Sequence, residues 1–250
     1  MSKPIAAQLY SVRQQCAVDF AGALKQVSDI GYAGVEMASL PVPAEEAARV
    51  ISGLGLQVCS AHTSFPTDEN VASVVETQKV LGNKTIISGF RPADFESEAA
   101  VRRVAGIAQR GAVLAKQHGL RVGIHNHYWE FRSKLNGRYG YDLLMELTPD
   151  AFPQLDVFWA NHGGADSVEV VTRYRDRIRS LHIKDGPLDK GMPMTAIGKG
   201  DMDIPPIVQA ADPNVLEWLI VELDECATDM VEALKDSFDY LVSTGLGHGR

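Results

Sequence analysis

Short apolar segments alternate with helical patterns along the whole chain. The helical pattern is clearest before Gly119, where Val101, Val104, Ala108 and Ala112 recur at the spacing of one helix face. We expect strands at 5–9, 33–37, 56–61, 84–88, 120–126, 152–157, 178–184 and 216–223. We expect helices at 19–30, 44–54, 67–81, 96–118, 141–147, 168–174, 204–211 and 228–241.

Eight strands that alternate with helices predict parallel strands joined by helical crossovers. Eight such units in 250 residues match a (β/α)8 TIM barrel, an α/β fold, in number and in size. A doubly wound open sheet is the rival, but the first expected strand leads into Gln8, Leu9, Tyr10 and Ser11, which is no glycine-rich dinucleotide loop. No shift in composition marks a linker, so we expect residues 1–250 to form a single domain.

The charge balance is acidic, with 24 Lys and Arg against 32 Asp and Glu and a net charge of −8. Nucleic-acid binding usually leaves a basic footprint, so we expect no nucleic-acid partner. Cys16, Cys59 and Cys226 form no disulfide framework or close metal spacing, which indicates a reducing compartment. No apolar segment approaches the roughly 20 residues of a membrane span, and the first residues lack a signal-peptide core. We therefore expect a cytoplasmic protein without a membrane partner.

Side chains of metal-ligand types gather where the expected strands end, which is where a TIM barrel carries its active site. Side chains alternate along a strand, so His125 and His127 share one side, as do Glu222 and Asp224. Burying unpaired charges is costly, and a bound metal ion gives a physical reason to gather them. The residues at these strand ends are Glu36, His62, His125, Asn126, His127, Asp156, His182, Lys184, Asp185, Glu222 and Asp224.

Each of these residues also has a purely structural interpretation. A single histidine near a strand end is more often hydrogen-bonded than metal-bound, Asp156 could cap the next loop, and Glu222 could pair with Lys184. The string at 125–127 is too short to indicate a nuclease, and 197–201 lacks the full phosphate-loop pattern, which favours a mobile active-site loop. Trp159 and its aromatic neighbours are either core residues or a wall for a sugar ring. Residue types alone leave both explanations open.

Five segments together resemble the xylose isomerase-like TIM barrels, the sugar phosphate isomerase/epimerase superfamily. They look like the branch whose fifth strand reads His-Asn-His with Glu-Phe following, and the resemblance covers nearly the whole chain. The segments are Ile-His-Asn-His-Tyr-Trp-Glu-Phe at 124–131, Leu-Asp-Val-Phe-Trp at 155–159, Leu-His-Ile-Lys-Asp at 181–185, Ile-Gly-Lys-Gly-Asp-Met-Asp at 197–203 and Val-Glu-Leu-Asp-Glu at 221–225.

The resemblance implies one divalent metal ion held by residues from strands five to eight. Superfamily members use Glu, Asp, His and Glu, which here become His125, Asp156, His182 and Glu222, with His127 as the other candidate on strand five. The histidine at the first position departs from the family pattern, in which two glutamates act as paired acid and base. Two histidines and two carboxylates suit Mn²⁺, Zn²⁺, Co²⁺ or Fe²⁺ better than Mg²⁺.

The same resemblance implies a sugar isomerase or epimerase that removes a proton next to a carbonyl. The metal ion would polarise the carbonyl and stabilise an enediolate, with Glu222 as the base and His127 or Lys184 as the second proton-transfer group. The substrate is expected to be a sugar or keto-sugar, and no cluster of Lys and Arg marks a phosphate pocket. The residues expected to bind it are Glu36, His62, Glu130 and Trp159.

Three other functions stay open at this point. The first is a carbon–oxygen lyase similar to inosose dehydratases, which would act on a cyclic polyol or keto-glycoside. The second is a phosphodiester-cleaving nuclease similar to endonuclease IV, which the acidic charge balance disfavours. The third is a sugar-binding barrel without catalysis. A homo-oligomer is possible, and the sequence does not fix the oligomeric state.

Overall fold

Eight parallel strands close into a barrel, which confirms the (β/α)8 fold and excludes the open doubly wound sheet. The computed structural model describes residues 2–132, 134–189 and 191–250. The ring closes because the first strand pairs in parallel with both the second and the last. In order around the barrel the strands are β1 (Lys3–Gln8), β2 (Gly34–Met37), β3 (Gln57–His62), β4 (Thr85–Ser88), β5 (Arg121–His125), β8 (Ala151–Asp156), β9 (Ser180–Ile183) and β10 (Trp218–Val221).

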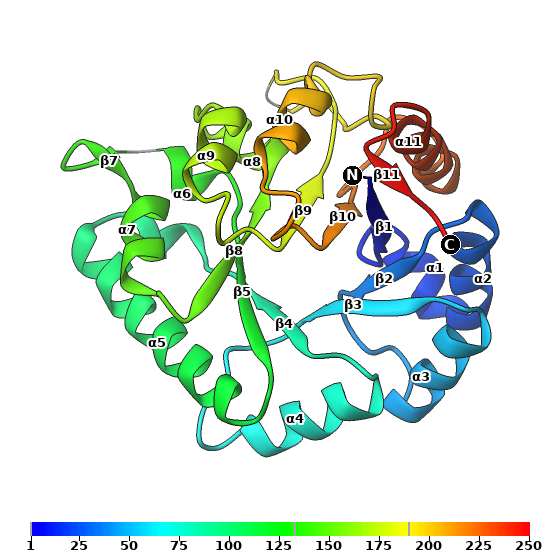
Figure 1. Cartoon of the computed structure of the whole chain (residues 1–250), viewed down its shortest axis with the longest axis horizontal. Helices are drawn as coiled ribbons and strands as arrows, with labels where there is room; N and C mark the ends of the chain where they lie inside the picture. The colour runs from blue at the N-terminus through cyan, green and yellow to red at the C-terminus, as the bar shows by residue number, and fades with distance from the viewer. Residues whose placement is uncertain (1, 133, 190) are drawn as a thin grey trace.

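Helices surround the ring of strands, as Figure 1 shows for α3, α4, α5 and α7. Their apolar faces cover the outside of the barrel, and Val101, Val104, Ala108 and Ala112 of α5 are all buried. No helix in the described part of the chain is both long and apolar enough to span a bilayer. The main helices are α2 (Phe20–Ile30), α3 (Ala44–Gly53), α4 (Val71–Val80), α5 (Glu98–Gln117), α7 (Gly140–Leu147), α9 (Ser167–Arg173), α10 (Ile204–Ala210) and α11 (Met230–Ser243).

The sequence pattern misplaces one helix start and misses several short elements. The helix expected from residue 67 begins at Val71, because Asn70 Oδ1 accepts a hydrogen bond from Thr67 N (2.7 Å) and folds 67–70 into a turn. The missed elements are too short to show a period. They are α1 (Arg13–Val18), the 3₁₀ helix η1 (Pro92–Phe95), α6 (Trp129–Arg132), the hairpin of β6 (Lys134–Leu135) and β7 (Arg138–Tyr139), α8 (Val157–His162), and β11 (Gly247–His248), which pairs with β1.

Strand register brings polar residues to two levels inside the barrel. Side chains alternate along each strand, so Gln154 and Asp156 of β8 point the same way, as do Ser180 and His182 of β9. Asp156 and His182 therefore lie one step closer to the barrel mouth than Gln154 and Ser180. The paired positions are Gln8 with Glu36, Glu36 with Ser60, His125 with Gln154, Gln154 with Ser180, and Asp156 with His182.

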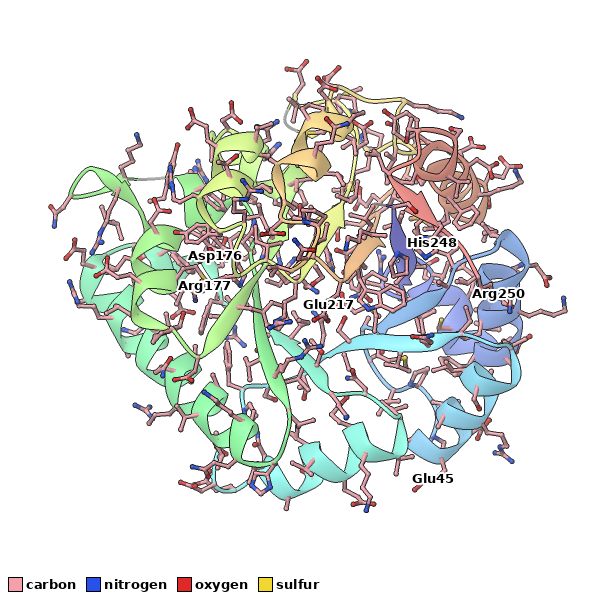
Figure 2. The ribbon with its side chains drawn as sticks, in the orientation of Figure 1. Glu45, Asp176, Arg177, Glu217, His248 and Arg250 are labelled. Atoms are coloured by element: carbon pink, nitrogen blue, oxygen red, sulfur yellow. The ribbon has the colours of Figure 1, made fainter. Side chains whose placement is uncertain are left out.

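Ion pairs hold the opposite end of the barrel. Glu217, labelled in Figure 2, directly precedes β10, and its carboxylate receives hydrogen bonds from Arg121 (2.6 Å) and Arg179 (2.6 Å). The pKa of Glu217 lies below its usual value, because both guanidinium groups outweigh the effect of burial. Glu217 is thus a glutamate, like Glu222 at the barrel mouth, but it is held in structural ion pairs at the other end of the barrel. It can serve as a control residue for substitutions of glutamates at the mouth.

Candidate active site

Four side chains of the expected metal-ligand set meet at the barrel mouth. His125 ends β5, Asp156 ends β8, His182 lies on β9, and Glu222 directly follows β10. Each offers one ligand atom, and these four atoms all lie within 4.8 Å of one another. Four ligands at about 2.0–2.2 Å from one ion in tetrahedral geometry lie about 3.3–3.6 Å apart. The four atoms are therefore close enough for adjustment of the side chains to bring them to one ion.

The two oxygens of Asp156 have different environments. Oδ1 caps α8 by accepting a hydrogen bond from Trp159 N (2.8 Å), so the structural interpretation of this residue holds. Oδ2 is buried and accepts no hydrogen bond of suitable geometry from the described residues, although Lys184 Nζ lies 3.1 Å away. A buried carboxylate oxygen without a hydrogen-bond donor is what a cation site requires. The donor set of two imidazoles and two carboxylates fits a divalent transition metal ion.

Lys184 places a fixed positive charge beside this cluster. Its Nζ lies 2.9 Å from Glu222 Oε2 and 2.9 Å from Asp224 Oδ2, so the expected pairing with Glu222 is present. Burial alone would lower the pKa of Lys184, but the three neighbouring carboxylates raise it well above its usual value. Lys184 is therefore charged, and it compensates part of the negative charge gathered at the mouth.

The protonation states suit a metal site. Burial lowers the pKa of His125 well below its usual value, which leaves a neutral imidazole able to ligate. Burial would raise the pKa of Glu222, but Lys184 and His182 bring it well below its usual value, so this carboxylate is ionised. Burial raises the pKa of Asp156 to about 6. Against the effect of burial, Glu36 and Glu222 raise the pKa of His182 to about 10, so a bound ion would replace a proton there.

A cavity of about 460 Å³ opens above the cluster. Two of the residues expected to bind substrate, His62 and Trp159, line it. His127, Lys184 and Glu222, the expected proton-transfer groups, line it as well. The cavity therefore brings the candidate base and a candidate sugar-stacking ring to one space.

Glu36 and Glu130, which were also expected to bind substrate, do not line this cavity. Glu36 is completely buried, and its carboxylate accepts hydrogen bonds from five side chains below the cluster. Glu130 is 1% exposed, and its Oε2 accepts a hydrogen bond from His127 N (2.9 Å). Burial raises the pKa of Glu130 well above its usual value. Direct contact of either carboxylate with substrate stays a prediction.

The loop after β9 is tied to one carboxylate. Asp185, which is fully buried, accepts hydrogen bonds from the backbone N–H groups of Gly186 (2.8 Å), Gly198 (2.8 Å), Gly200 (3.1 Å) and Met202 (3.1 Å). A Cβ atom at position 200 would overlap Asp185 Oδ1 and the Gly186 backbone, so the close approach requires glycine. The segment 197–201 is thus folded onto Asp185 beside the site.

We expect Asp185→Asn to loosen this loop. The substitution keeps the size of the side chain but removes the charge that four backbone donors share. Hydrogen bonds to charged groups contribute about 1.5–3 kcal/mol each, so we expect the free energy of unfolding to fall by about 2–4 kcal/mol. Urea unfolding and limited proteolysis within 186–202 measure the effect. Asp201→Asn is the matched control, since Asp201 accepts one backbone hydrogen bond in the same loop, from Leu188 N (3.0 Å). Equal stability and equal proteolysis of the two variants would contradict the role of Asp185.

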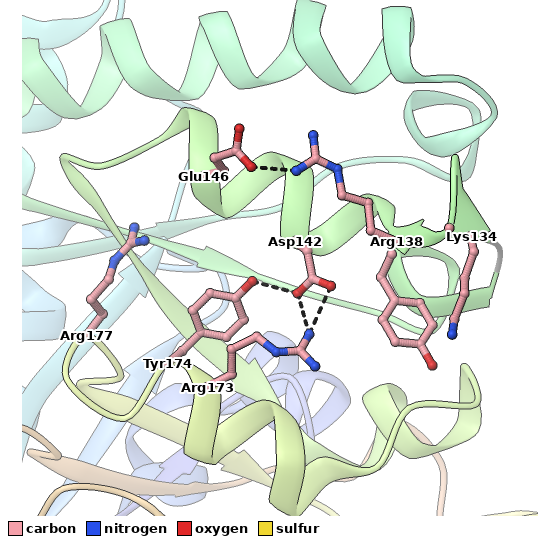
Figure 3. A pocket seen from close by; sticks show the side chains of 9 residues that line it. Lys134, Arg138, Asp142, Glu146, Arg173, Tyr174 and Arg177 are labelled. Carbon is pink, nitrogen blue, oxygen red and sulfur yellow. Dashed lines mark hydrogen bonds and ion pairs between the residues drawn. The ribbon is translucent and has the colours of Figure 1, made fainter.

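A second cavity, also about 460 Å³, lies on the outer wall between α7, α9 and the β6–β7 hairpin. Figure 3 shows that its two carboxylates, Asp142 and Glu146, are paired within the wall. Asp142 binds Arg173 (2.8 Å) and the Tyr174 hydroxyl (2.7 Å), and Glu146 binds Arg138 (2.5 Å). Because these two carboxylates are already paired, the described residues that line this cavity present no free carboxylate and no ligand set.

The sequence analysis missed the polar level below the ligands. Gln154, Ser60 and Ser180 are buried, and each precedes a site residue by two positions on its strand: Asp156, His62 and His182 respectively. A polar residue two positions before an inward site residue points to the same side of the strand. This spacing is the signal that could have identified them.

Comparison with known proteins places the chain in one family of TIM barrels. The profile described as xylose isomerase-like TIM barrel matches residues 24–244. Inosose dehydratase from Mesomycoplasma hyopneumoniae (strain 7448) is 24% identical over 269 residues, which covers 90% of this chain and 89% of that protein. Inosose dehydratase from Clostridium perfringens (strain 13 / Type A) is 29% identical over 141 residues, and this match spans about half of each protein, 48% of this chain and 46% of the relative.

Solved structures share the same architecture. A sugar phosphate isomerase/epimerase from Parabacteroides distasonis superposes with a TM-score of 0.78 at 25% identity, covering 96% of this chain and 94% of that chain. An L-ribulose 3-epimerase superposes with a TM-score of 0.71 at 18% identity, covering 98% and 95%, which shows similarity of fold alone.

Proposed function

The chain belongs to the xylose isomerase-like TIM barrel family, and from this we propose that it is a metal-dependent sugar isomerase or epimerase. The observation that carries the proposal is the group of His125, Asp156, His182 and Glu222 below an open cavity at the barrel mouth. When bound, a divalent ion supplies Lewis-acid polarisation of a carbonyl group. The residues of the chain then have to bind the sugar, remove a proton next to the carbonyl and return it elsewhere.

Glu222 is the base in this proposal. His182 Nδ1 and Lys184 Nζ both lie 2.9 Å from Glu222 Oε2 and fix the carboxylate. Among the described residues none donates a hydrogen bond to Oε1, and Glu222 lines the cavity. Because the pKa of Glu222 is held well below its usual value, the carboxylate is ionised and able to accept a proton.

His127 is the better of the two second proton-transfer candidates. It lines the cavity, and its ring stacks on Trp129 with 4.1 Å between ring centroids. Burial and the nearby Lys184 charge lower the pKa of His127 to about 4, so the ring is neutral and has both a donor and an acceptor nitrogen. Lys184 is bound to three carboxylates and serves charge compensation, which makes it the weaker candidate for proton transfer.

The substrate in this proposal is an uncharged sugar or keto-sugar. Lys184 is the only lysine or arginine among the described residues that line the cavity, and carboxylates already neutralise it. The described lining residues therefore leave no free Lys or Arg side chain to bind a phosphate group. Trp159 supplies an aromatic wall suited to the apolar face of a sugar ring.

Dehydration is the second candidate, and two observations favour it. The family resemblance implies a second acid/base glutamate at the position of His125 in epimerases, and the curated relatives described above are inosose dehydratases. Both reactions begin with removal of a proton next to a carbonyl. A dehydratase then expels a β-hydroxyl group, which leaves as water with the proton that was removed, whereas an isomerase returns the proton to carbon.

A substrate panel separates the two reactions. We expect the protein loaded with Zn²⁺, Mn²⁺ or Co²⁺ in D₂O to incorporate deuterium into at least one non-phosphorylated ketose, inosose or keto-glycoside. Mass spectrometry of the product distinguishes isomerisation, which keeps the mass apart from deuterium, from dehydration, which loses water. The same protein treated with a chelator is the control and should be inactive. Absence of exchange and of water loss across the metal-loaded panel would contradict both candidates.

A further inference from the structure

Glu36 lies at the centre of a buried hydrogen-bond network below the proposed metal ligands. It belongs to β2, which stands opposite β8 in the ring, so its side chain spans the barrel interior. The donors on Oε1 are Gln8 Nε2 (2.5 Å), His62 Nε2 (3.0 Å) and His182 Nε2 (2.6 Å), and the donors on Oε2 are Ser60 Oγ (2.5 Å) and Gln154 Nε2 (2.6 Å). A completely buried carboxylate is tolerated only when such donors satisfy it.

The network determines which nitrogen of His182 can ligate. An ionised carboxylate only accepts hydrogen bonds, so the nitrogen that faces Glu36, Nε2, carries a proton. The other nitrogen, Nδ1, faces Glu222 Oε2 at 2.9 Å and lies on the side of the remaining ligands. Because Nε2 keeps its proton against Glu36, only Nδ1 can present a lone pair, once a bound ion replaces the proton that Nδ1 donates to Glu222 Oε2. A carboxylate behind a ligating histidine also increases its basicity.

The same carboxylate acts on His125 through Gln154. Gln154 Nε2 donates to Glu36 Oε2, so the amide oxygen points the other way and accepts from His125 Nδ1 (3.2 Å). His125 must then carry its proton on Nδ1 and keep a lone pair on Nε2. That Nε2 atom lies 4.0 Å from Asp156 Oδ2, on the cluster side of the ring.

We propose that Glu36 is a positioning residue which, directly and through Gln154, fixes the ligating tautomers of both histidines of the site. One buried carboxylate therefore prepares two ligand atoms from the strands on either side of β8, His125 Nε2 and His182 Nδ1. The carboxylate has no exposed surface, which suits a role that acts through the two histidines. The inference rests on the proposed divalent ion and extends that proposal to the residues that orient its ligands.

Nitrogen NMR of the intact chain tests the tautomers without any substitution. With ¹⁵N-histidine and bound Zn²⁺, we expect His182 to show a protonated Nε2 and a metal-shifted Nδ1, and His125 to show the reverse. The His182 Nε2 proton should exchange slowly with solvent, because both partners of that hydrogen bond are buried. A metal-shifted Nε2 on His182 would overturn the proposal.

Metal affinity of variants gives the second test. We expect Glu36→Gln to weaken binding of Zn²⁺ or Co²⁺ to the metal-free protein by about 10–100-fold, the usual effect of losing a partner behind a metal ligand. The absorption bands of bound Co²⁺ should shift as well, which a loss of general stability would not cause. Glu217→Gln is the matched control and should bind as the parent protein does. Unchanged affinity and an unchanged spectrum in Glu36→Gln would overturn the proposal.

A double variant tests whether Gln154 acts through Glu36. Gln154→Leu removes the acceptor of His125 Nδ1, and we expect it to weaken binding as well. If the two residues form one network, the double variant Glu36→Gln/Gln154→Leu loses affinity by a smaller factor than the product of the factors for the two single variants. If the double variant loses affinity by the full product of the two factors, Gln154 does not act through Glu36.

If the parent protein takes up neither Zn²⁺ nor Co²⁺, the proposed function fails too. If it binds one ion with His182 Nε2 as ligand, only the tautomer inference fails.

Discussion

His182→Ala is expected to reduce the bound divalent metal from about one ion per chain to nearly none. The substitution removes a completely buried imidazole that lies between Glu36 (2.6 Å) and Glu222 (2.9 Å). Loss of a partner behind a ligand already costs about 10–100-fold in affinity, so loss of the ligand itself should cost at least about 100-fold. Metal analysis after dialysis against Zn²⁺ or Co²⁺ measures the stoichiometry. Turnover of any substrate found in the panel should disappear with the metal.

Asp156→Ala should have the same effect on metal content, and it needs a control for the helix cap that is lost with it. Asp166 is that control, because it caps α9 through Val168 N (2.8 Å) and Glu169 N (3.1 Å) far from the ligand set. Losing an N-cap typically costs about 1 kcal/mol of stability, so Asp166→Ala shows what the loss of a cap alone does. Only Asp156→Ala should lose metal. Unchanged stoichiometry in both His182→Ala and Asp156→Ala would exclude this ligand set.

The positions of the ligands could be predicted because they follow from strand periodicity and fold class. Asp156 and His182 occupy carboxyl ends of neighbouring strands, and the register of β8 and β9 pairs them directly. Once eight βα units are recognised, these ends must converge at one face of the barrel. The strand ends alone are thus sufficient to predict that Asp156 and His182 lie close together, whereas the choice of the four proposed ligands came from the family resemblance.

The role of Glu36 could not be predicted in the same way. Its position at a strand end is correct, but the sequence does not say how far a side chain reaches across the barrel or what covers it. Five donors from four other strands surround its carboxylate, and three of them, Gln8, Ser60 and Gln154, were not recognised as site residues. The hydrogen bonds of Asp185 with the loop that follows it depend on backbone conformation and were likewise beyond pattern analysis.

Glu222→Gln is expected to have the largest effect on the chemical step. A positioned general base typically contributes about 10²–10⁴-fold, and the amide cannot accept the substrate proton. The measurement is the rate of solvent-deuterium incorporation into the substrate at saturating metal. Metal content has to be measured in the same samples, because Glu222 also belongs to the ligand set. A variant that keeps its metal but loses exchange isolates the role of the base.

Glu217→Gln provides the comparison on the same strand segment. This substitution makes the same chemical change at the other end of β10, where Glu217 forms ion pairs with Arg121 and Arg179. It should leave the rate of deuterium incorporation unchanged. The carboxylate at the mouth differs from this one in facing a cavity and in having one oxygen without a donor among the described residues. If Glu222→Gln exchanges deuterium as fast as Glu217→Gln does, Glu222 is not the base, and proton removal would have to be assigned to His127.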